Sequence, residues 1–206
     1  MARKTKEEAS RTRQQIIDAA RQVFLERGVS RTTLEQVAKA AGVTRGAVYW
    51  HFANKAELFF AMKEQVSLPL IDRTDSFLLA ENLADPLDGI EQSLREFFRT
   101  LDESAEVRQT FDIMILRCEY VDEFAPVLEE VNKTHIDFVG KLEEAYRRAL
   151  AKGTLRPGLV PADMALDTWA FILGLTRQWL SGYPCEILRQ MVPGIIATHV
   201  ALRRAP

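Results

Sequence analysis

The sequence lacks the features on which several classes of protein depend. It has two cysteines, Cys118 and Cys185, which are too few for a disulfide framework, and no CxxC or Cys/His spacing typical of a metal site. No stretch approaches the roughly 18 uninterrupted apolar residues of a membrane-spanning helix. The polar first fifteen residues contain no apolar signal-peptide core. We therefore expect a soluble, cytoplasmic protein with no metal or other cofactor and no membrane partner.

The sequence motifs of common enzymes are also missing. Only three histidines are present, His51, His135 and His199, and no G-x-S-x-G motif, P-loop or carboxylate pair accompanies them. We expect a protein that is not an enzyme. An enzyme that transforms apolar small molecules inside a helical bundle is the alternative from another functional class, and turnover of any such compound would support it.

Charge is distributed unevenly along the 206 residues. Residues 1–63 contain twelve Lys/Arg and six Asp/Glu, whereas the remainder contains fifteen and twenty-three. A basic N-terminal third fits a polyanionic partner, and an acidic remainder is unsuited to lie against the same partner. A merely solvated surface is the alternative explanation of the same imbalance.

Apolar residues recur at helical spacing nearly throughout, and no alternating strand pattern is bounded by hairpin turns. The sequence therefore predicts an all-α fold. Pro69 is expected to end or kink the fourth helix, because proline lacks the N–H that a helix interior needs. The expected helices cover about 7–27, 34–41, 45–52, 54–68, 86–101, 104–118, 124–151, 161–180 and 184–203.

The second and third expected helices have the spacing of a helix-turn-helix. Thr33 and Thr44 are good N-caps, and Gly42 permits the left-handed backbone of a tight turn. Small residues at Ala38 and Ala41 allow the two helices to cross closely. The pattern thus predicts a short third helix held against the second by its apolar side.

The other side of that third helix carries an arginine and two aromatic residues, which is typical of a helix that enters the major groove of DNA. Helix N-termini suit phosphate oxygens, and a nearby histidine and lysine fit backbone contacts. The alternatives are that the aromatic residues pack internally and that the histidine has no special role. The candidate DNA-contacting residues are Thr33, Thr44, Arg45, Gly46, Tyr49, Trp50, His51 and Lys55.

The segment from Thr12 to Phe60, with the core VTRGAVYWHFANKAELF, resembles the DNA-binding region of the TetR family of bacterial repressors. The opening MARKTKEEASRTRQQI and the element Arg117-Cys118-Glu119-Tyr120 resemble the members that control multidrug efflux pumps. The resemblance implies an all-helical homodimer with about nine helices per subunit, whose last two helices form an intersubunit bundle. It also implies a pseudo-palindromic operator that the dimer releases when ligand binds, and it assigns DNA contacts to the matching residues above.

The rest of the chain is rich in large apolar residues, which favour a core but also suit a mostly apolar ligand cavity. Met114-Ile115-Leu116 stands where the efflux-pump group often has polar residues. His135 and Asn132 are candidate polar contacts for a hydrophobic or aromatic ligand. The candidate wall residues are Ile90, Phe97, Phe111, Ile115, Phe138, Leu142, Trp169 and Leu173.

Together these features predict a DNA-binding domain at 1–55 and a ligand-binding and dimerisation domain at 56–206. The expected function is a ligand-responsive repressor of a multidrug efflux system. Two alternatives stay open within the same family: a regulator of a metabolic or degradative operon, and a dimer that no longer binds DNA. The Arg45/Tyr49/His51/Lys55 set argues against the second of these.

Overall fold

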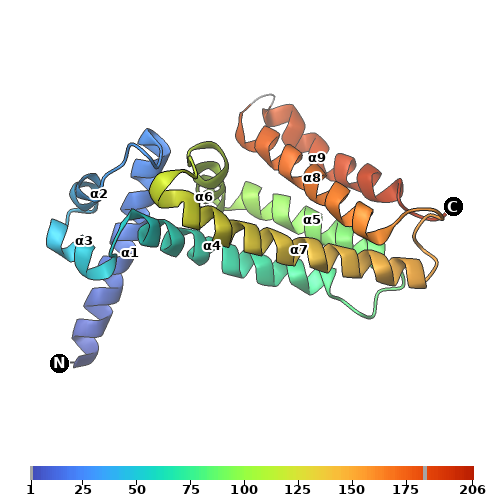
Figure 1. The fold of residues 1–206 in the computed structure, drawn as a ribbon, viewed down its shortest axis with the longest axis horizontal. Coiled ribbons are helices and arrows are strands. Elements are labelled where there is room, and N and C mark those ends of the chain that lie inside the picture. The colour runs from blue at the N-terminus through green and yellow to red at the C-terminus, as the bar shows by residue number, and fades with distance from the viewer. Residues whose placement is uncertain (1, 183–184) are drawn as a thin grey trace. The chain divides into compact units, whose positions relative to one another are not determined.

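The computed structural model describes residues 2–182 and 185–206, and over these residues the chain is all-α, as predicted (Figure 1). The only extended pairing among them is an isolated bridge between Leu155 and Arg204. The predicted start of the last helix at Pro184 lies outside the described residues. The helices are α1 (Ala2–Arg27), α2 (Leu34–Ala41), α3 (Arg45–His51), α4 (Lys55–Leu78), α5 (Pro86–Glu103), α6 (Ala105–Leu116), a 3-10 turn η1 (Asp122–Phe124), α7 (Ala125–Ala151), α8 (Pro161–Leu180) and α9 (Cys185–Ala201).

The chain packs as two compact units. The first comprises Met1–Ser67 with Glu106–Glu129, and the second comprises Leu68–Ala105 with Glu130–Pro206. Helices α4 and α7 each contribute residues to both units. This division reflects packing, whereas the predicted boundary at 55/56 concerns function and stays a prediction.

The first unit is built on the apolar side of α1. Ile16, Ala20 and Phe24 recur at helical spacing and are fully buried, and α2 and α3 pack beside α1 (Figure 1). Gly28 ends α1 with φ +79°, a conformation that a residue without Cβ adopts at little cost, and its N–H donates to the Phe24 carbonyl at 2.8 Å. Helix α1 begins at Ala2 rather than near residue 7, so the helix extends before the apolar positions from which its start was predicted.

Pro69 does not end the fourth helix, so that part of the prediction is wrong, while a kink there stays a prediction. Helix α4 continues to Leu78 with Pro69 inside it. The missing N–H leaves the Gln65 carbonyl without its usual donor, but Gln65 and Pro69 are both exposed, so water can supply that hydrogen bond. Beyond the proline, Leu70 and Leu78 are buried, and their packing keeps the last turns helical.

A buried chain of polar groups joins three helices of the second unit. The Tyr146 and Thr168 hydroxyls are 2.7 Å apart, and Thr168 Oγ1 lies 3.1 Å from His199 Nε2, so the chain connects α7, α8 and α9. Burial, followed by the nearby Arg203 guanidinium, lowers the pKa of His199 to about 4. His199 is therefore neutral at neutral pH, and its ring stacks on Phe171 at 3.8 Å between centroids.

Candidate nucleic-acid interface

The turn between α2 and α3 has the predicted caps. Thr33 Oγ1 accepts from the Gln36 N–H at 3.2 Å, while the Gln36 side chain accepts from the Thr33 N–H at 3.0 Å, which completes a capping box. Gly42 has φ +66°, so the left-handed turn falls on the predicted glycine. Thr44 Oγ1 then accepts from the Ala47 N–H at 3.1 Å and starts α3. Local sequence alone therefore fixes both ends of this short motif.

One side of the motif is buried, and the opposite side therefore faces outward. Val37, Val48 and Phe52 are at most 1% exposed, and Ala38 is also buried. Ala41, the second small residue predicted where the two helices cross, is half-buried. Val48 is buried at the middle of α3, whereas Arg45, Tyr49 and Trp50 are exposed and form its outward side.

The outward side of α3 exposes a surface that internal packing does not explain. Trp50 is 73% exposed and Tyr49 46% exposed, so neither is a core residue. At Gly46 the nearest atom to an added Cβ would be Thr44 Oγ1 at 3.8 Å, so the fold itself does not require glycine there. A surface with a glycine and exposed aromatic rings suits close approach by a partner.

Arg45 is held in position on this surface by two neighbours. Its guanidinium pairs with the Glu35 carboxylate and lies 5.3 Å from the centre of the Tyr49 ring. Contact with the Tyr49 side chain, and then the charge of Glu35, raises the pKa of Arg45. Arg45 is therefore a cation held at the start of α3, and its partner Glu35 is a residue of this surface that the sequence pattern did not single out.

His51 lies at the edge of the exposed surface. Its ring meets Trp50 edge-on, with 4.5 Å between centroids, and Arg13 lies over the adjacent Phe52 ring at 5.1 Å. Partial burial, and then the charge of Arg13, lowers the pKa of His51. An imidazole at this edge can donate or accept a hydrogen bond.

Lys55 is placed differently from the other candidate DNA contacts. Its side chain is only 11% exposed, and Nζ pairs with Glu123 at 3.0 Å. The same ammonium donates to the Ser30 carbonyl at 3.4 Å and lies 5.4 Å from the Phe124 ring centre. A contact with a phosphate would require Lys55 to leave Glu123, so its predicted role stays a prediction. No sequence pattern points to this partner, because Glu123 is 68 residues away.

Of the predicted ligand-pocket residues, three that belong to the second unit form an aromatic cluster. The Trp169 ring lies 4.6 Å from His135 and 5.8 Å from Phe138. Ile90 and Leu142 are fully buried in the same unit.

The remaining pocket candidates are scattered. Phe97 meets Phe98 edge-on at 5.2 Å, and Leu173 is 41% exposed. Asn132 is exposed, while Phe111 and Ile115 are half-buried residues of the first unit. The pocket assignment as a whole stays a prediction.

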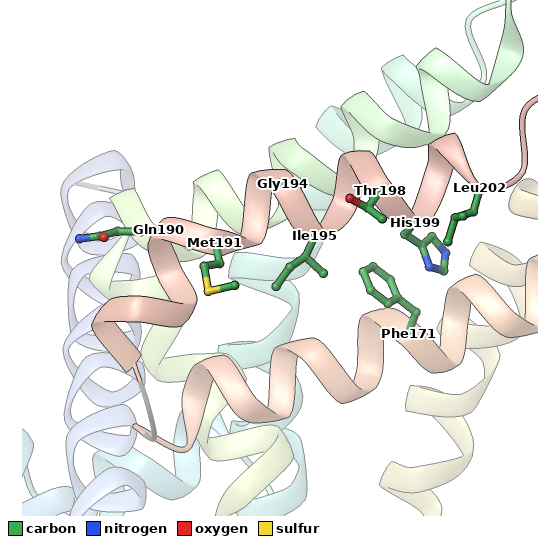
Figure 2. Close-up of a pocket in the computed structure, with 8 residues that line it drawn as sticks. All are labelled: Phe171, Gln190, Met191, Gly194, Ile195, Thr198, His199 and Leu202. Carbon is green, nitrogen blue, oxygen red and sulfur yellow. The ribbon is translucent and has the colours of Figure 1, made fainter.

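A shallow apolar hollow lies between α8 and α9, with a volume of about 620 Å³ (Figure 2). The stacked Phe171 and His199 rings form one part of it, and Met191 and Ile195 form another. Met191 and Leu202 are more than half exposed. The second unit thus exposes aliphatic area that has no partner within the described part of the chain.

A capped helix-turn-helix with a basic and aromatic outer surface defines the class of DNA-binding regulators. Residues 16–62 match the family described as "Bacterial regulatory proteins, tetR family". The chain is also 38% identical over 181 residues to the HTH-type transcriptional regulator TtgR of Pseudomonas putida, covering 87% of this chain and 85% of that protein. The protein belongs to the TetR family.

Solved structures agree with this assignment over nearly the whole chain. The crystal structure of NalD, the secondary repressor of the MexAB-OprM multidrug efflux pump in Pseudomonas aeruginosa, superposes with a TM-score of 0.86 at 34% identity, covering 96% of this chain and 98% of NalD. A complex of SmeT with triclosan gives 0.80 at 32% identity, with 94% and 91% covered. SmeT is the repressor of the Stenotrophomonas maltophilia efflux pump SmeDEF.

These comparisons confirm the predicted family and the prediction that the chain is a transcriptional regulator rather than an enzyme. Among the described residues, none of the helices is long and apolar enough to cross a bilayer. In the same part of the chain, no group of three or more His, Cys, Asp or Glu side chains is arranged to hold a metal ion.

Proposed function

We propose that this protein is a dimeric repressor that binds the operator of a multidrug efflux system and releases it when a hydrophobic or aromatic compound binds. The exposed outer surface of α3 carries the proposal, because Trp50 and Tyr49 are exposed there rather than packed in the core. Two relatives, NalD and SmeT, are repressors of multidrug efflux pumps, which supports the regulated system. A repressor of this kind acts on DNA in the cytoplasm.

In this proposal α3 lies in the major groove. Arg45, at the start of the helix, donates to a guanine or a phosphate, and Gly46 lets the backbone come close to base edges. Tyr49, Trp50 and His51 contact the sugar-phosphate backbone or a thymine methyl. The N-termini of α2 and α3, at Thr33 and Thr44, direct free N–H groups at phosphates.

The hollow between α8 and α9 is proposed as the dimer interface. A two-fold axis would place the same aliphatic surface of a second copy against it, in the self-complementary arrangement of most homodimers. The exposed Met191 and Leu202, which line the hollow, would then be buried. The two copies of α3 would then bind two half-sites of the operator whose centres are one turn of the DNA helix apart, about 34–36 Å, or somewhat more.

Ligand response needs a binding site whose occupation disfavours the DNA-bound arrangement. The aromatic cluster of Trp169, His135 and Phe138 suits a flat apolar compound, and the solved complex of SmeT contains triclosan. Helix α4 runs without interruption from Lys55 to Leu78, and so links residues of both units. A coupling of about 1–3 kcal/mol would reduce operator affinity roughly 5- to 150-fold.

The decisive experiment selects bound duplexes from random DNA and then titrates the selected operator with triclosan. We expect a pseudo-palindromic sequence, steep loss of affinity with salt, and release by triclosan or a related aromatic compound. The double variant Arg45→Ala/Tyr49→Ala is the matched control and should select nothing. Absence of any preferred sequence at moderate ionic strength would refute DNA recognition. Unchanged operator affinity with triclosan demonstrably bound would refute the coupling.

Lys55 gives a finer test of the same interface. If Lys55 turns from Glu123 to a phosphate on binding, Lys55→Ala weakens binding to all sequences and flattens the salt dependence. Glu123→Gln, which removes the competing carboxylate, should strengthen binding to all sequences. If neither variant changes the salt dependence, Lys55 does not contact DNA and serves only to join α4 to η1.

A further inference from the structure

A second recessed site lies in the second unit, in a groove between α5 and α9 that none of the predicted ligand-pocket residues lines. Its volume is about 430 Å³, within the range of small-molecule sites. Phe98 and Trp179, 4% and 3% exposed, form its aromatic floor with Val192 from α9. The groove is therefore apolar at its base.

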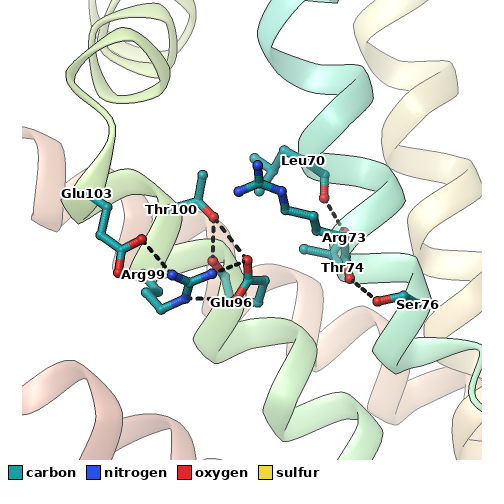
Figure 3. A network of polar contacts seen from close by, with 8 residues as sticks. All are labelled: Leu70, Arg73, Thr74, Ser76, Glu96, Arg99, Thr100 and Glu103. Atoms are coloured by element: carbon teal, nitrogen blue, oxygen red, sulfur yellow. Dashed lines mark hydrogen bonds and ion pairs between the residues drawn. The ribbon is translucent and has the colours of Figure 1, made fainter.

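Three arginines line the same groove, and two of them already have carboxylate partners. Arg95 donates to Glu91 at 2.8 and 2.9 Å. Arg99 donates through two nitrogens to Glu96 at 2.7 and 2.9 Å and also pairs with Glu103, as Figure 3 shows. These pairs neutralise most of the charge that α5 brings to the groove.

Arg189, from α9, is different. Its guanidinium lies over the Trp179 ring, 4.6 Å from the centroid. Its Nε is buried without a hydrogen-bond partner, and no carboxylate of the described residues forms an ion pair with it. A desolvated N–H donor without an acceptor is unfavourable, and a planar carboxylate is the group that a guanidinium binds best.

The groove therefore combines a guanidinium that has no ion-pair partner among the described residues with an aromatic floor beside it. We propose that it binds a small aromatic carboxylate, whose ring packs on Phe98 and Trp179 and whose carboxylate accepts from Arg189. Asp102 at the groove and the paired Glu96 disfavour ligands with more than one negative charge. This site is separate from the inducer site proposed above, and its ligand class is anionic rather than neutral.

Isothermal titration of the full-length protein with 2-naphthoate, without DNA, tests the proposal. We expect saturable binding of one molecule per chain, and at least tenfold weaker binding of the neutral 2-naphthamide, because a hydrogen bond to a charged group contributes about tenfold or more. Arg189→Gln should weaken naphthoate binding by a similar factor. The matched control Arg177→Gln, an exposed arginine of α8 that does not line the groove, should bind as the unchanged protein does.

A second variant guards against indirect effects of removing Arg189. Gln92 is an exposed lining residue on α5, so Gln92→Trp fills the groove from its mouth without disturbing the core, and it should abolish binding. The proposal is overturned if Arg189→Gln or Gln92→Trp binds naphthoate normally, or if the amide binds as tightly as the acid. Because operator binding takes no part in these measurements, the proposal and the repressor function can fail independently.

Discussion

The outer surface of α3 and the hollow between α8 and α9 both expose large apolar side chains, but they differ in what accompanies those side chains. On α3 the exposed rings of Tyr49 and Trp50 have polar tips and stand beside Arg45. The residues that line the hollow include no Lys, Arg, Asp or Glu, and Met191 is typical of them. Apolar exposure indicates a missing partner in each case. The charge beside the apolar side chains distinguishes the two proposed partners: a polyanion for the surface of α3, and a second copy of the same surface for the uncharged hollow.

The largest expected effect comes from placing a charge in the hollow. Met191→Arg should convert the dimer to a monomer and reduce operator affinity about 100- to 10,000-fold, because two linked helix-turn-helix motifs bind far more tightly than one. Analytical ultracentrifugation and operator titration measure the two quantities. Ile136→Arg, at a residue of α7 that is 72% exposed and does not line the hollow, is the control and should change neither. A dimeric Met191→Arg variant with normal affinity would show that the hollow is not the interface.

The next effect concerns base preference at α3. Arg45→Ala should reduce discrimination against the wrong base by about 1–3 kcal/mol at one position of each half-site, while binding to non-specific DNA changes less. Competition among single-base variants of the selected operator measures it. Uniform weakening at every position would instead make Arg45 a phosphate contact.

His199 predicts a pH dependence of stability within the second unit. Its folded pKa of about 4 lies below the value of about 6.5 expected on unfolding, so unfolding takes up a proton below pH 6.5. Stability should fall by roughly 2 kcal/mol from this residue between pH 7.5 and pH 5, and little further below pH 4. Urea unfolding at fixed protein concentration measures it, and His199→Gln should remove that part of the slope. An unchanged slope in the variant would place the titration elsewhere.

The smallest expected effect tests the local cap of α2. Thr33→Ala removes the acceptor of the Gln36 N–H and should lower the free energy of unfolding by about 1 kcal/mol. Gln178→Ala, at an exposed position of α8, is the control and should have little effect. Thermal unfolding measures both. Equal losses in the two variants would mean that the capping box contributes nothing specific.

Features that depend on residues close together in the sequence could be predicted, whereas those that depend on distant residues could not. Thr33, Gly42 and Thr44 act on residues within four positions, so the motif and its outward surface were predictable. The predicted helix end at Pro69 was wrong, since solvent exposure of the freed carbonyl depends on which way the helix faces.

Partners that the fold brings together from different helices could not be predicted from the sequence for the same reason. In the sequence Lys55 looks like an exposed cation, but in the fold it pairs with Glu123. Arg189 likewise looks like an ordinary surface arginine, but in the fold it lies over the Trp179 ring of α8. Helical spacing predicts which side of a helix is apolar, but it does not predict which other helix covers that side.

The three tryptophans fall on three different surfaces. Trp50 is on the outer surface of α3, Trp169 is in the aromatic cluster, and Trp179 is the floor of the groove. Each is therefore an intrinsic fluorophore for one proposed partner: the operator, the inducer or the aromatic acid. Variants that keep a single tryptophan would report each equilibrium optically, without any attached dye.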